Sequence, residues 1–79
     1  MYYVYVLKSV NYGKYYVGQT KDLEQRLIHH NGKHARWTLR YQPWKLVHFE
    51  EYATRSEAMQ RERYLKNQKN KEKILFQKN

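Results

Sequence analysis

A glutamate stands on the apolar face of a predicted helix near the end of the chain. Glu62 lies between Ala58 and Leu65, about 40° from Ala58 on a wheel of about 100° per residue. A carboxylate in that position costs desolvation energy unless something pairs with it. One interpretation is a partner arginine, or a face turned so that Glu62 reaches solvent. The other is a metal-binding carboxylate at the rim of a pocket.

An arginine and a histidine border the apolar row of an earlier helix. Leu23 and Leu27 form that row, His30 continues it, and Arg26 lies beside it. Arg26 and His30 are four residues apart, so their side chains project from the same side. Arg26 can extend its charge to solvent while His30 is an ordinary edge histidine. Alternatively, the pair presents a cation and a titratable group to a phosphate.

Tyrosines crowd two short stretches, YYVYV at 2–6 and KYYVGQT at 14–20. Both stretches are rich in strand-forming residues, and we predict strands over 2–8 and 15–19 joined in a hairpin by a turn with Asn11 and Gly13. Gly18 marks a bulge, or a place where the backbone must come close to another group. The question is whether the rings fill the core or offer their hydroxyls for chemistry.

The remaining elements follow from capping and alternation. We predict a helix capped by Thr20, with Asp22 in its first turn, that runs to about His30 and ends in a left-handed cap at Asn31–Gly32. A basic loop over 33–43 follows, and then a strand over 44–52.

A second long helix begins at a capping box, with Thr54 as the cap and Glu57 at its third position. It runs to about Lys66. The tail is expected to add a last helix that docks through Ile74, Leu75 and Phe76. The elements predict an α+β sandwich in which a mixed or antiparallel three-stranded sheet packs with two or three helices.

Composition narrows the class of protein. The 79 residues are expected to form one domain over 1–79, whose small core uses many of the nine tyrosines. The net charge of +9 favours a polyanionic partner, nucleic acid before others. Without cysteine there is no disulfide. We expect no signal peptide, no membrane span and a cytoplasmic protein.

The predicted loop after the first helix combines cations with aromatic rings. Trp37 and Tyr41 alternate there with basic residues, and this pattern can follow a nucleic-acid backbone and stack on bases. The basic residues are Lys33, His34, Arg36 and Arg40. An ordinary solvated loop with Trp37 turned inward explains the pattern equally well.

In their order and spacing, these motifs resemble the GIY-YIG nuclease superfamily. Tyr3-Val4-Tyr5 matches the first family motif, with Tyr3 in place of its glycine, and Tyr16-Val17-Gly18 matches the second. Arg26 in DLEQRL and Glu62 in EAMQRER match the family arginine and its metal-binding glutamate, and His30 matches a position that many members use. The resemblance covers nearly the whole chain. It is most specific for a small stand-alone subgroup that lacks the separate DNA-binding domain of larger members.

The resemblance implies hydrolysis of a phosphodiester bond, most readily in DNA. Glu62 would hold one divalent ion, Mg²⁺ or Mn²⁺, and Arg26 would clamp the phosphate. Tyr5 is the first choice to take the proton from water, with Tyr16 orienting it, and His30 is an alternative relay. Tyr15 would point to the other face of the sheet and serve in packing.

Further roles are expected at the periphery of the site. Lys14 is a candidate to stabilise a tyrosinate and, with the basic loop residues, to bind nucleic acid. We expect a monomer, with a protein partner as one source of target choice. Two other functions stay open: a non-catalytic nucleic-acid-binding module with the same fold, and a protein-interaction domain that docks through the apolar tail.

Overall fold

The computed structural model describes residues 1–33 and 36–68. Its three strands form one antiparallel sheet in the order β2-β1-β3, with β1 (Tyr2–Ser9) between β2 (Tyr15–Thr20) and β3 (Trp44–Tyr52). The predicted hairpin and third strand are confirmed. Gly13 has a φ of 66° in the hairpin turn, a conformation that favours glycine.

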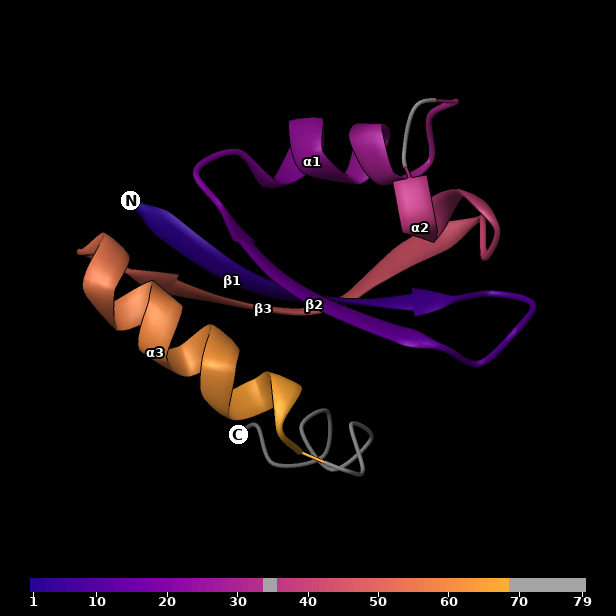
Figure 1. Cartoon of the computed structure of the whole chain (residues 1–79). Helices are drawn as coiled ribbons and strands as arrows, with labels where there is room; N and C mark the ends of the chain where they lie inside the picture. The colour runs from indigo at the N-terminus through magenta and orange to yellow at the C-terminus, as the bar shows by residue number, and fades with distance from the viewer. Residues whose placement is uncertain (34–35, 69–79) are drawn as a thin grey trace.

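Helices cover both faces of the sheet, as Figure 1 shows: α1 (Leu23–His30) and α2 (Arg36–Leu39) lie on one face and α3 (Arg55–Lys66) on the other. The predicted α+β sandwich is therefore confirmed, with an antiparallel sheet. The expected helix in the tail lies outside the described residues. Within 1–33 and 36–68, no helix is long and apolar enough to cross a membrane.

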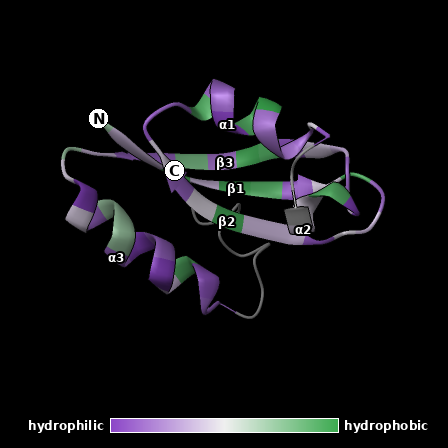
Figure 2. Cartoon of the chain, turned by 45° about the horizontal axis from the view of Figure 1, so that its top comes forward, coloured by the Kyte–Doolittle hydropathy of each residue, from purple (hydrophilic) through white to green (hydrophobic). Residues whose placement is uncertain are grey.

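The central strand carries two small cores because both of its faces are covered. Val4 and Val6 pack toward α3, while Tyr5 and Leu7 pack toward α1, and none of the four side chains is more than 2% exposed. In Figure 2 the apolar colour accordingly appears on stretches of the strands and on short patches of α1 and α3. The bulge in the sheet lies between Val6 and Leu7 opposite β3, and not at Gly18.

The ends of α1 differ from the prediction. Asp22, and not Thr20, is the N-cap, since its carboxylate accepts a hydrogen bond from the Gln25 amide at 3.1 Å. The helix does end at Asn31, but this residue has a φ of −98°, so its cap is not left-handed. By contrast, the capping box of α3 is present as predicted.

The segment predicted as a loop over 33–43 contains a helical turn, α2, over Arg36–Leu39. Its Thr38 is only 5% exposed, and the Thr38 carbonyl accepts a hydrogen bond from the Trp44 indole at 2.7 Å. This bond ties α2 to the start of β3. Helix α2 therefore lies over the same face of the sheet as α1.

Candidate active site

A tyrosine ring lies directly against the glycine of the second motif. Tyr5 on β1 pairs with Gly18 on β2, and a Cβ atom added to Gly18 would come within 2.5 Å of the Tyr5 hydroxyl oxygen and 2.7 Å of its Cζ atom. Of the two roles predicted for Gly18, a bulge or a close approach of the backbone to another group, the structure shows the close approach. The absence of a side chain there lets the Tyr5 ring lie across the edge strand.

The Tyr5 hydroxyl begins a buried chain of hydrogen bonds. It lies 3.0 Å from Nε2 of His30, and Nδ1 of His30 lies 3.2 Å from the Thr38 hydroxyl. His30, at the end of α1, is 4% exposed, so it is no ordinary edge histidine. The Arg26 cation lies within electrostatic reach of the Tyr5 hydroxyl.

Burial sets the protonation of this pair. It raises the pKa of Tyr5 well above its ordinary value, helped by Tyr16 and Glu62, while Arg26 opposes the shift. Burial, with the neighbouring His29 and Arg26, lowers the pKa of His30 to about 4. At neutral pH the resting site therefore holds a protonated Tyr5 beside an uncharged imidazole.

The two adjacent tyrosines of β2 face opposite sides of the sheet, as predicted. Tyr16 lies on the α1 side, where its ring centroid is 4.6 Å from that of His30 and 6.3 Å from that of Tyr5. Tyr15 packs into the core beneath α3. Tyr16 therefore lines the candidate site, and Tyr15 serves the core.

Glu62 reaches the edge of β2 from the opposite face. Its carboxylate accepts a hydrogen bond from the Gln19 amide at 3.3 Å and pairs with Lys66 at 3.1 Å, with 19% of the side chain exposed. The first interpretation expected an arginine or solvent around Glu62, and the partners in the structure are instead Gln19 and Lys66. Since Glu62 also raises the pKa of Tyr5, the two groups are within electrostatic reach.

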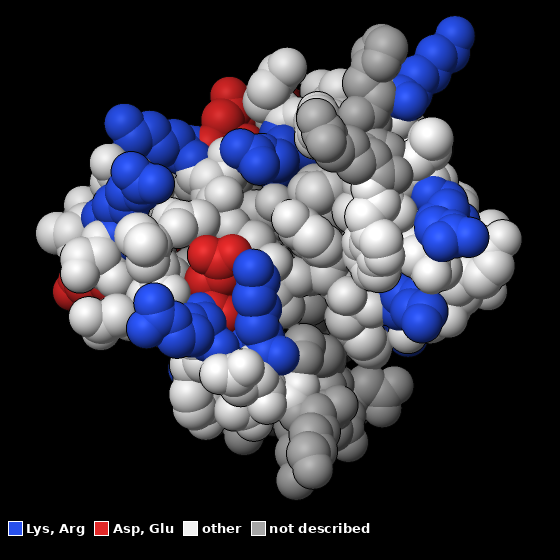
Figure 3. All heavy atoms as spheres, viewed as in Figure 1, with Lys and Arg blue, Asp and Glu red and all other residues white. Residues whose placement is uncertain are grey.

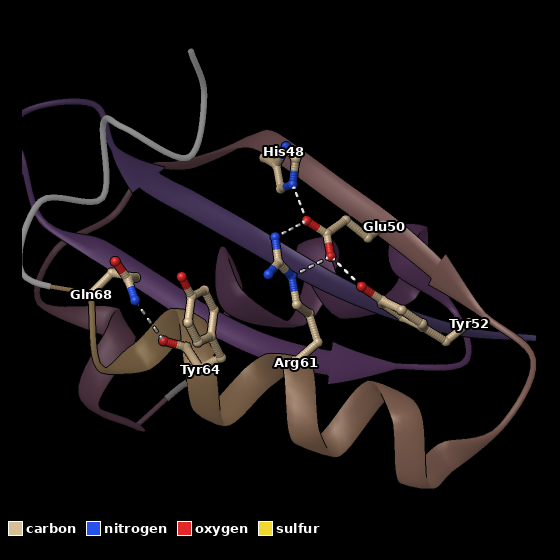
Figure 4. Close-up of polar contacts among 6 residues, drawn as sticks. All are labelled: His48, Glu50, Tyr52, Arg61, Tyr64 and Gln68. Atoms are coloured by element: carbon tan, nitrogen blue, oxygen red, sulfur yellow. Dashed lines mark hydrogen bonds and ion pairs between the residues drawn. The ribbon is translucent and has the colours of Figure 1, made fainter. Parts of the chain in front are cut away.

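The arginine next to Glu62 anchors α3 to the sheet. Arg61 donates two hydrogen bonds to Glu50 of β3, at 2.8 and 3.0 Å. Tyr52 and His48 complete the partners of the same carboxylate, as Figure 4 shows. Burial alone would raise the pKa of Glu50, but the hydrogen bonds from Arg61, Tyr52 and His48 outweigh it and lower the pKa to about 2. This anchor fixes the turn of α3 that carries Glu62.

An open hollow of about 620 Å³ lies beside α1, along the segment that runs from the end of β2 into this helix. Arg26 forms part of its wall. The other lining residues are Thr20, Lys21, Asp22, Gln25 and His29. Two cations, Lys21 and Arg26, thus line a hollow that is open to solvent, which suits an anionic ligand. The charge of Arg26 also acts on Tyr5 and His30.

Comparison with known proteins decides the family. The model of the GIY-YIG catalytic domain matches residues 1–75. This chain belongs to the GIY-YIG family. It is 42% identical over 75 residues to a UPF0213 protein of Streptococcus pneumoniae and 44% identical over 75 residues to one of Bacillus pumilus, covering 94% of this chain and 75% and 76% of those proteins. The solution structure of a UPF0213 protein from Bacillus halodurans has a TM-score of 0.56 and 32% identity, over 96% of this chain and 82% of that one.

The GIY-YIG residues predicted from the sequence come together in part. Tyr5, Tyr16, His30 and Arg26 gather on the α1 side, and Glu62 approaches from the α3 side. Members of this family are generally nucleases that use divalent ions. Among the described residues, no group of three His, Cys, Asp or Glu could hold a metal. A single carboxylate nevertheless suits Mg²⁺, which is bound through one or two carboxylates plus water and substrate phosphate.

The predicted nucleic-acid-binding residues lie around α2 and the hairpin turn. Lys14 and Arg40 stand over the Tyr41 ring, at 5.5 and 5.9 Å from its centroid. Trp37 is 49% exposed, and its ring centroid lies 4.9 Å from that of Tyr41. Lys33 is exposed, Arg36 is the first residue of α2, and His34 lies outside the described residues. The exposed indole and the two cations leave this surface open to a ligand.

Sequence reasoning missed two residues of the site. Thr38 holds the far nitrogen of His30, and Gln19 holds the carboxylate of Glu62. One sequence feature pointed to Thr38: it is a hydroxyl residue beside Trp37, in a segment where basic and aromatic residues otherwise alternate. Gln19 offered a weaker one, as the polar residue after Gly18 on a strand whose alternation places it on the side of α3.

Proposed function

We propose that this protein is a divalent-metal-dependent endonuclease that hydrolyses phosphodiester bonds, with DNA as its substrate. One observation carries the proposal: the Tyr5 hydroxyl lies 3.0 Å from Nε2 of a neutral, buried His30, within electrostatic reach of the Arg26 cation and of Glu62. Family membership supports the same reaction. A module that only binds nucleic acid has no use for a carboxylate beside the phosphate, because it repels the ligand.

In this mechanism Arg26 clamps the scissile phosphate from the open hollow and neutralises charge that develops on it. Tyr5 takes a proton from the attacking water as its own proton passes to Nε2 of His30. The raised pKa of Tyr5 makes a standing tyrosinate unfavourable, so both transfers occur together. Bound phosphate adds negative charge nearby and makes protonation of His30 easier.

Glu62 would hold the divalent ion through the carboxylate that now pairs with Gln19 and Lys66. When bound, the ion supplies electrophilic stabilisation of the phosphate and of the leaving oxygen. Gln19 keeps one carboxylate oxygen aimed at the edge of β2. Thr38 keeps the His30 ring in the orientation that receives the proton.

A nuclease assay on Glu62→Gln tests the proposal. Labelled duplex DNA, single-stranded DNA and RNA are incubated with Mg²⁺ or Mn²⁺. The matched control is Glu51→Gln, which makes the same change at an exposed carboxylate of β3. We expect the wild type and Glu51→Gln to cut DNA only with metal, and Glu62→Gln to lose at least about 100-fold in rate, the scale of a lost electrostatic group. Metal-dependent cutting by Glu62→Gln would refute the role of Glu62. Tighter binding by that variant, with no cutting by any protein, would mean a binding module.

A further inference from the structure

A row of hollows leads from the candidate site along the outer side of α3. The first, of about 330 Å³, shares Thr20 and Lys21 with the hollow that holds Arg26, and it reaches Arg55. The second, of about 630 Å³, continues from Arg55 to Arg63. The third, of about 310 Å³, continues from Arg63 to Lys66 and includes Glu62. Each hollow shares at least one lining residue with the next, so they form one depression.

Four cations line this depression, and we call Lys21, Arg55, Arg63 and Lys66 the α3 track. Glu62 is the carboxylate among them, and it pairs with Lys66. Within 1–33 and 36–68, the structure shows no ion pair for Lys21, Arg55 or Arg63. Figure 3 shows Lys and Arg side chains gathered around carboxylate groups on this face.

The arginines of α3 fall into two groups, one that holds the helix to the sheet and one that lines the hollows. Arg61 is committed to Glu50 and anchors α3, whereas Arg55 and Arg63 point into the outer hollows. Both are exposed, and the half-exposed Met59 lies between them. Helix α3 therefore uses one side for packing and presents two cations on the other, where the described part of the chain shows no ion pair for them.

The spacing of the track fits a nucleic-acid backbone. Eight residues separate Arg55 from Arg63, which is about 12 Å of helix. Successive phosphates of one strand advance by about 3.4 Å, so this distance spans about three to four phosphates. A strand held there continues toward Lys21 and Arg26 on one side and passes Glu62 on the other.

We propose that the α3 track binds the sugar-phosphate backbone of the nucleic acid and leads one strand to the candidate site. The inference rests on the proposed function for its ligand, and it assigns a surface that differs from the basic residues around α2 and the hairpin turn. Lys14 and Arg40 lie over Tyr41, on the α1 side of the sheet. The α3 track instead approaches Glu62 from the other side.

Binding is measured in EDTA, by fluorescence anisotropy of a short labelled DNA duplex and of its single strand over a series of KCl concentrations. Arg55→Gln/Arg63→Gln is compared with Lys8→Gln/Lys45→Gln, which removes the same charge from a cross-strand pair of β1 and β3 outside both basic surfaces. We expect the first pair to bind more weakly and to lower the slope of log affinity against log salt by about 1.8 on duplex, or about 1.4 on single strand, for two lost phosphate contacts. Circular dichroism checks that both pairs are folded.

The outcomes separate this inference from the proposed function, because cleavage is measured on the same proteins with metal. Binding by Arg55→Gln/Arg63→Gln at the wild-type slope would overturn the α3 track, even if the wild type cuts DNA. Equal losses in both pairs would overturn it too, since they would reflect net charge alone, and so would a wild type that binds neither probe. If Arg55→Gln/Arg63→Gln alone binds more weakly, and the wild type cuts no substrate, the α3 track is supported and the nuclease function is rejected.

Discussion

A methyl group at position 18 would test how closely the site depends on the contact between Tyr5 and the backbone. In Gly18→Ala the added Cβ atom would lie 2.5 Å from the Tyr5 hydroxyl oxygen. Non-bonded heavy atoms prefer about 3.5 Å, so the ring must withdraw by about 1 Å. The 3.0 Å contact between Tyr5 and His30 then lengthens beyond hydrogen-bond range.

Two costs follow from that withdrawal. Overpacking a well-filled site costs about 1–3 kcal/mol of the free energy of unfolding. Leaving a buried hydroxyl or imidazole nitrogen without its partner costs a similar amount, about 1–3 kcal/mol. If Tyr5 carries the proton, a displacement of about 1 Å also lowers the rate of cleavage by about 100-fold.

The assay is urea unfolding followed by tryptophan fluorescence, together with metal-dependent cleavage. Gly32→Ala is the matched control, because its Cβ atom would meet the His29 carbonyl oxygen at 3.3 Å, a contact that a small shift relieves. Adding Tyr5→Phe to Gly18→Ala removes the nearest atom and should recover part of the stability but none of the cleavage. A Gly18→Ala variant as stable and as active as Gly32→Ala would refute the reasoning.

Two further predictions concern charge. The pKa of His30 is about 4 when folded and about 6.5 in its ordinary state, so between these pH values the unfolded chain binds the extra proton. The free energy of unfolding should therefore fall as the pH drops from about 6.5 to about 4, by up to about 3 kcal/mol. Urea unfolding at stepped pH checks this, and a His30→Gln variant with the same slope would contradict it. Glu50→Gln should lower stability by about 1–2 kcal/mol because Arg61 loses its charged partner. Cleavage should fall as well, since this pair positions α3, and an unchanged rate in the folded variant would separate the anchor from the site.

Local signals predicted most of the fold. The strands follow from dense β-branched and aromatic residues, and the α3 start follows from the Thr54–Glu57 capping box. At α1, two neighbouring residues could each cap the helix, and the choice of Asp22 over Thr20 depends on which oxygen reaches the Gln25 amide. Helix α2 has only four residues and no apolar period, so its existence depends on the contact with Trp44.

The site was predictable in its members but not in its contacts. Glu62 was expected to need a partner, yet the arginine of this region belongs to Glu50. Arg61 and Glu62 are adjacent on the helix, so they point about 100° apart, and only the packing angle of α3 decides which faces β3 and which faces β2. The hydrogen bond between His30 and Thr38 joins α1 to α2, and nothing in the sequence indicated α2.

The arrangement of the site also explains why its strand lies at the edge of the sheet. Tyr5, His30 and Arg26 belong to one face and Glu62 to the other, and a sheet with full side chains would keep such groups apart. Within 1–33 and 36–68, β2 is an edge strand that pairs only with β1, so Glu62 can reach its rim beside Gln19. Gly18 removes the side chain that would otherwise stand between that rim and Tyr5. If β2 were a central strand, Glu62 could not reach its outer edge, and an alanine at position 18 would stand between Glu62 and Tyr5. The candidate site therefore depends on a glycine in an edge strand.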